Sequence, residues 1–98
     1  MNNVSLEYDE IQFKNTNEIL HILPTNDTLF LDFGRVKYID SSGLGLLLKI
    51  RSLVNGKLYI YNTTESVTKI MDILHVFKLY TTFEDAYTDA KQHGVLDE

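Results

Sequence analysis

Hydrophobic residues along the chain follow two periods, one of two residues and one near 3.6 residues, in alternating segments. Residues 4–8 and 11–13 alternate between apolar and polar positions, which predicts one or two short strands. Residues 28–33 and 57–61 are nearly continuous apolar runs, as expected of central strands covered on both faces. Residues 77–80 predict one further short strand.

Two helices are predicted between these strands. Asn15 is expected to cap the first, because Glu18 follows three residues later and Pro24 lies just beyond the apolar positions. The second helix covers residues 43–54. One arc of it is expected to face the sheet, and that arc contains Leu46, Leu47, Ile50, Leu53 and Val54.

Two more helices follow, and together with the strands they define the fold class. The third carries apolar residues at helical spacing over 67–74, with Asn62 or Thr63 as its cap. Thr82 caps the fourth, which ends at Gly94. Strands that alternate with helices predict the α/β class, with a right-handed crossover and parallel pairing between the two central strands.

Length and composition narrow the class of protein. The 98 residues, 44% of them hydrophobic, suffice for one domain (residues 1–98) with one core. Cysteine is absent, so a disulfide framework or a cysteine-ligated metal is excluded. A net charge of −5 argues against nucleic acid as a partner, because phosphates require a basic footprint. Without a secretory pattern or a long apolar run, we expect a cytoplasmic protein that does not insert into membranes.

The segment Asp40-Ser41-Ser42-Gly43-Leu44-Gly45 lies between a strand-like stretch and the second helix. A serine at the start of a helix can accept a hydrogen bond from a free backbone N–H. Gly43 and Gly45 remove side chains from the first turn, which leaves the backbone open to close approach. On physical grounds alone, this pattern favours a structural cap over a functional site.

Catalytic roles find little support around these serines. A nucleophilic serine needs a nearby base, and His21, His75 and His93 follow no pattern that would aim one of them at Ser41. The histidines are isolated, without the second ligand of a metal site. The segment 43–45 lacks the Lys-Ser/Thr ending of a phosphate-binding loop. We therefore expect no enzymatic activity, no metal and no cofactor.

The Asp-Ser-Ser-Gly-Leu-Gly segment, followed by three leucines, resembles the signature of STAS-domain anti-sigma factor antagonists, which are small bacterial switch proteins. The resemblance covers roughly residues 28–90, in the family's order and spacing. It implies a mixed β-sheet with helices packed mainly on one face. The chain is expected to depart from the family in a shortened N-terminal hairpin that lacks a Gly-Glu-Leu/Ile-Asp-like segment before the first helix. The sheet edge exposed in this way could favour weak dimers, although a monomer is the expected state.

The resemblance implies a phosphorylation switch at the serine that directly follows the aspartate, Ser41. A partner anti-sigma factor with serine-kinase activity would phosphorylate it, binding the unphosphorylated protein and releasing the phosphorylated one. A serine phosphatase could reset the switch, and Ser42 would be a neighbouring cap or support. The expected partner-binding residues are Asp40, Ser42, Gly43, Leu44, Gly45 and Leu48.

Leu44 and Leu48 have two interpretations. On a helical wheel they fall beside the arc that faces the sheet, so they could form an apolar contact patch for the partner. They could equally pack against the loop at Tyr38.

Two further functions remain open. STAS-like domains also serve as subunits of lipid-transporting ABC complexes, where this chain would bind the ATPase and Ser41 would be a structural contact. The intact serine pair and the glycine spacing favour the switch over this alternative. A STAS module for another phosphorylation-controlled regulator is not distinguished from the switch by the sequence.

Overall fold

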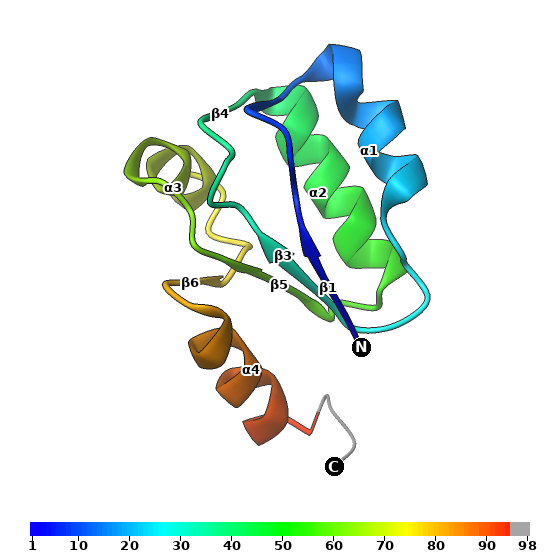
Figure 1. Cartoon of the computed structure of the whole chain (residues 1–98), viewed down its shortest axis with the longest axis vertical. Coiled ribbons are helices and arrows are strands. Elements are labelled where there is room, and N and C mark those ends of the chain that lie inside the picture. Colours follow the sequence, from blue (N-terminus) through cyan, green and yellow to red (C-terminus); the bar gives the residue numbers. More distant parts are fainter. Residues whose placement is uncertain (95–98) are drawn as a thin grey trace.

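Four short strands form the central sheet of the structure, a computed structural model that describes residues 1–94 (Figure 1). They are β1 (Asn2–Ser5), β3 (Leu29–Asp32), β5 (Leu58–Tyr61) and β6 (Leu79–Tyr80). The strands lie in the order β1-β3-β5-β6, and each neighbouring pair is parallel. The two apolar runs therefore form the two central strands, as predicted, because each has a hydrophobic cluster on both faces of the sheet.

A second, two-stranded parallel sheet lies at the start of the second helix. It consists of β2 (Glu10–Ile11) and β4 (Tyr38–Ile39), with Ile11 opposite Ile39. Both isoleucines are fully buried. Because β4 leads directly into the helix, this small sheet fixes the position at which the helix begins.

Within the described residues, four α-helices flank the central sheet. They are α1 (Thr16–Ile22), which a 3-10 turn (Phe13–Asn15) precedes, α2 (Ser41–Leu53), α3 (Glu65–Asp72) and α4 (Phe83–Gln92). Helices α1, α2 and α3 contribute to one hydrophobic cluster, and α4 packs on the opposite face of the sheet (Figure 1). The predicted α/β class, with helices mainly on one face, is confirmed.

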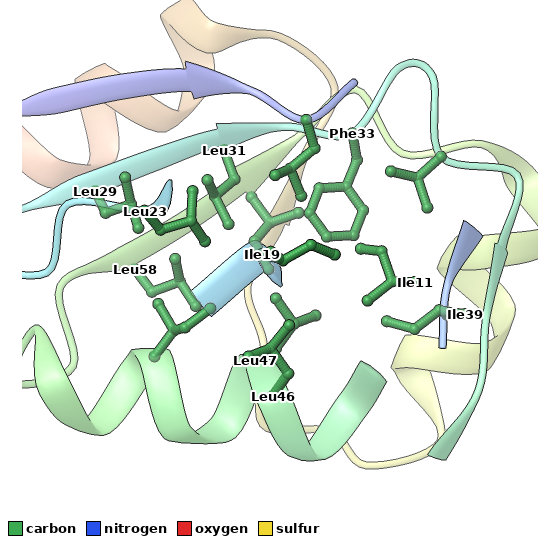
Figure 2. Packing of buried hydrophobic residues seen from close by; sticks show 14 of the residues in the cluster. Ile11, Ile19, Leu23, Leu29, Leu31, Phe33, Ile39, Leu46, Leu47 and Leu58 are labelled. Carbon is green, nitrogen blue, oxygen red and sulfur yellow. The ribbon is translucent and has the colours of Figure 1, made fainter. Parts of the chain in front are cut away.

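The alternation of side chains along the central strands separates two hydrophobic clusters. Leu29 and Leu31 of β3 belong to the larger cluster under α1 and α2, whereas Phe30 belongs to the smaller one under α4. Figure 2 shows Leu46 and Leu47 of α2 pointing from their helix into the larger cluster. The N-terminal half of α2 is thus anchored in the larger cluster.

The ends of the last helix agree with the prediction, whereas α3 differs in its cap and ends at Asp72, two residues before Leu74. Thr82 caps α4, and Gly94 follows that helix with a φ of +69°, which glycine adopts without steric cost. Helix α3 is capped by Thr64 instead of Asn62 or Thr63. The side chains of those two residues make hydrogen bonds elsewhere, so neither is free to act as the cap.

The N-terminal strands differ most from the prediction. Strands form at 2–5 and 10–11, and they pair in parallel with β3 and β4 instead of with each other. No hairpin forms within the described residues, and the pairs there are all parallel instead of mixed. A short strand, Glu10–Ile11, lies directly before the 3-10 turn and the first helix. Alternation in sequence does not reveal which strand will be the partner.

Candidate functional site

The first turn of α2 is capped by an aspartate and not by a serine. Asp40 has an extended backbone, and its Oδ1 accepts a hydrogen bond from the Gly43 N–H at 2.9 Å. Its Oδ2 accepts a longer one from the Phe13 N–H at 3.4 Å. The prediction that Ser41 or Ser42 caps the helix is therefore wrong. Helix α2 begins two residues earlier than expected, and both serines lie within its first turn.

Gly43 allows α2 to approach the small sheet closely. A Cβ atom at this position would lie 2.6 Å from the Ile11 carbonyl oxygen and 2.6 Å from Ile39 Cγ1. The same carbonyl accepts a hydrogen bond from the Asp40 N–H at 3.1 Å, so it is fixed in place. Gly43 itself is buried. By packing closely against the small sheet, Gly43 fixes the position of the site.

Ser41 is the exposed residue of this turn. It is the first residue of α2, directly after the capping aspartate. Among the hydrogen bonds of residues 1–94, none involves its hydroxyl. The fold therefore makes no use of the Ser41 hydroxyl, which leaves it accessible to another molecule.

The leucines of α2 divide between core and surface, with one exception to the prediction. Leu46, Leu47, Ile50 and Val54 are buried as expected, but Leu53 is 47% exposed. Leu53 lies in the last turn of the helix, where the core covers the next residue, Val54, but not Leu53. Leu44 is half-buried against the core, and Leu48 is 40% exposed. Of the two leucines proposed as a contact patch, Leu48 is the more accessible.

Two aromatic residues flank the site from outside α2. Phe13 is 80% exposed, and its backbone donates to the Asp40 carboxylate. Tyr38 of β4 is 46% exposed and precedes the site by three residues. The sequence does not reveal Phe13 as part of the site, because the alternating residues around it predict a strand. The available signal is Asn15, whose side chain accepts from the Gln12 N–H and donates to the Glu10 carbonyl, closing a 3-10 turn that contains Phe13. Asn15 occupies the N-cap position of α1 as predicted, but its side chain makes no capping bond to that helix.

A groove runs between the first turns of α1 and α2. We call it the α1–α2 groove, and it has a volume of about 190 Å³. Apart from its own turn of helix, a Cβ atom added to Gly45 would meet no atom of residues 1–94 within 4 Å, so this glycine opens into free space. The two glycines of the motif therefore differ, since Gly43 faces the core and Gly45 faces the groove. The groove is lined by Thr16, Asn17 and Leu20 of α1 and by Ser42, Gly45, Leu46 and Lys49 of α2.

The histidines lie outside this site in the described part of the chain. His21 Nδ1 lies 2.7 Å from the Asn17 carbonyl oxygen, and His93 pairs with Asp89 at 2.8 Å. His75 adopts a positive φ in the loop after α3. Within residues 1–94, no three His, Asp or Glu side chains are placed to hold a metal ion together. No helix in this range is long and apolar enough to span a bilayer.

Two comparisons with known proteins concern the sequence and the fold of this chain. The family model described as the STAS domain matches residues 9–94. The crystal structure of a proposed anti-sigma factor antagonist from Thermotoga maritima superposes with a TM-score of 0.70. It shares 18% sequence identity, over 91% of this chain and 87% of that chain. The family match covers β2 to α4 and includes the whole of the site around Asp40 and Ser41, and the chain therefore belongs to the STAS domain family.

Proposed function

We propose that this STAS domain is an anti-sigma factor antagonist controlled by phosphorylation of Ser41. The unphosphorylated protein binds a serine-kinase anti-sigma factor or a related switch kinase, and the phosphorylated protein releases it. The carrying observation is that Ser41 is exposed and has no hydrogen bond within residues 1–94, while the adjacent Asp40 holds the helix start. The Thermotoga maritima neighbour, described as a proposed anti-sigma factor antagonist, supports the same role.

The proposed switch acts on the partner and not on the fold. A phosphate on Ser41 adds about −1.5 to −2 charges at pH 7. It would stand at the N-terminus of α2, where the helix dipole favours an anion. The cap survives, because the Asp40 carboxylate is already held by the Gly43 N–H. A partner packed against this surface would meet the phosphate and Asp40 together, which costs binding energy through repulsion and desolvation.

The loss of partner affinity on phosphorylation can be put in numbers. A loss of about 3 kcal/mol in the complex corresponds to a roughly hundredfold weaker Kd. This loss is comparable to the penalty for leaving a charge without a partner in an interface. Phosphorylation therefore suffices to release a partner bound with moderate affinity.

An affinity capture from the native bacterial lysate tests this proposal. The baits are wild type, Ser41→Ala and Ser41→Asp, and captured proteins are identified by mass spectrometry. Ser52→Asp is the matched control, because Ser52 is an exposed serine near the other end of the same helix. We expect wild type, Ser41→Ala and Ser52→Asp to retain a serine-kinase protein that Ser41→Asp loses. Equal capture of a transporter ATPase by all baits would contradict the switch and favour an ABC-complex subunit.

The contact surface beside Ser41 has a test of its own. Leu48 is 40% exposed on α2, so Leu48→Asp changes the surface without opening the core. We expect this variant to weaken binding of the kinase captured above, measured by calorimetry, by about tenfold or more. A folded Leu48→Asp variant with wild-type affinity would exclude Leu48 from the contact surface.

A further inference from the structure

The α1–α2 groove is not explained by the packing of the chain. Helix packing normally fills the space between neighbouring helices with side chains. Here the position that faces the space is Gly45, and no atom of the described residues outside its own turn of helix lies within 4 Å of the place where its Cβ would be. An alanine would be better suited to the helix by about 1 kcal/mol. The fold thus leaves room at a position where a larger residue would stabilise it.

The lining of the groove combines apolar and polar residues. Leu20, which is half-buried against the core, and the edge of Leu46 supply apolar surface. Asn17 and Ser42 supply polar groups. A pocket that offers both apolar surface and polar groups suits an anchor residue of an interface. A cavity of about 150 Å³ holds a benzene molecule, so a groove of 190 Å³ has room for one large apolar side chain.

Lys49 is the charged residue among those that line the groove. The chain carries a net charge of −5, yet no Asp or Glu occurs between Ser41 and Thr64. Within residues 1–94, Lys49 takes part in no ion pair. The acidic residue of α1, Glu18, accepts a hydrogen bond from the Tyr8 hydroxyl instead. An unpaired cation beside an apolar pocket is complementary to a carboxylate on the occupant.

We propose that the α1–α2 groove is an anchor site for a partner protein, which inserts one apolar side chain over Gly45 and pairs an adjacent carboxylate with Lys49. The anchor site rests on the proposed function, since it places the kinase partner next to Ser42 and therefore beside Ser41. It adds a requirement to that function. A preformed groove on the α1 side of α2 holds the partner, and a phosphate on Ser41, the first residue of that helix, releases it.

A selection of helical peptides tests the chemistry of the occupant. A phage-displayed library of helical peptides is selected on the full-length wild-type protein, and the enriched peptides are synthesised. We expect a shared apolar residue with Asp or Glu within one helical turn. Gly45→Leu should fill the groove and weaken their binding about tenfold or more. Failure to enrich such peptides, or equal affinity for Gly45→Leu, would overturn the anchor site.

Charge reversal and a matched control complete the peptide test. Lys49→Glu should weaken the acidic peptides, and replacing the peptide carboxylate with Lys should restore binding to Lys49→Glu. Ser52→Leu is the control, because it places the same side chain on the same helix face, seven residues beyond Gly45 and outside the groove. An effect of Ser52→Leu equal to that of Gly45→Leu, or insensitivity to the charge reversal, would overturn the proposal. So would a dimer in light scattering that Gly45→Leu dissociates, because the occupant would then be a second copy.

The same bait series separates this proposal from the proposed function. Gly45→Leu is added as a bait in the capture from lysate. Loss of the kinase from Ser41→Asp but not from Gly45→Leu would support the switch and overturn the anchor site. Loss from Gly45→Leu but not from Ser41→Asp would support the anchor site and overturn the switch.

Discussion

Alanine substitutions at the two glycines at the start of α2 are predicted to change the stability of the protein in opposite directions. In Gly43→Ala the new methyl group would lie 2.6 Å from both the Ile11 carbonyl oxygen and Ile39 Cγ1. Neither neighbour can move easily, because both residues pair with each other in the small sheet. Forcing a methyl group into a dense core costs about 1 to 3 kcal/mol. In Gly45→Ala the methyl group meets nothing within 4 Å.

The difference between the two variants isolates the steric cost. Both gain up to about 1 kcal/mol in helix propensity, so Gly45→Ala should be more stable than wild type. Gly43→Ala should be less stable than Gly45→Ala by about 1 to 3 kcal/mol. For a chain of this length each kcal/mol shifts Tm by about 4–8 °C, and circular dichroism during heating measures it. Equal Tm values for the two variants would refute the close approach of α2 to the small sheet.

Three further predictions concern the cap, the core boundary and pH. Asp40→Ala should lose about 0.5–2 kcal/mol in urea unfolding, and Asp40→Asn, which still caps, should lose much less; equal losses would contradict the capping role. Ile50→Ala should cost about 2–5 kcal/mol and Leu53→Ala less than about 1 kcal/mol, because Ile50 is fully buried and Leu53 is 47% exposed; similar losses would place Leu53 in the core. The hydrogen bond from the Tyr80 hydroxyl holds the pKa of Asp89 below its usual range. Its stabilisation is therefore present above about pH 4 and lost as the pH falls through the lowered pKa, so wild type should lose more stability than Asp89→Asn in urea unfolding between pH 6 and pH 3; identical pH profiles would exclude this contribution.

The central strands and the helix boundaries show what local patterns can predict. β3 and β5 lie inside the two apolar runs, because a strand covered on both faces needs apolar residues at successive positions. Thr82 and Gly94 mark the two ends of α4 because capping depends on residues only a few positions apart. Leu53 is predicted to be buried and is 47% exposed, since a helical wheel gives direction but not which side of the last turn the core covers.

The functional site depended on contacts between distant parts of the chain. Phe13 and Asp40 are 27 residues apart, and their hydrogen bond brings the 3-10 turn before α1 to the start of α2. In the sequence, Gly43 and Gly45 look alike, because both are glycines in the first turns of the same helix. Only the position of the small sheet shows that Gly43 packs against other residues and that Gly45 faces open space. The α1–α2 groove likewise forms between two helices, and the sequence does not show that these helices lie side by side.

By itself, the sequence determined the α/β class, the two central strands, the last helix with its caps, and the segment from Asp40 to Gly45 as the place of interest. These features follow from periodicity and from interactions within a few residues. The tertiary structure decided that the Ser41 hydroxyl has no hydrogen bond within residues 1–94, that β1 and β2 pair in parallel with other strands, and that Gly45 opens into a groove. Each of these depends on which distant segments pack together, and packing geometry is not encoded in the local pattern.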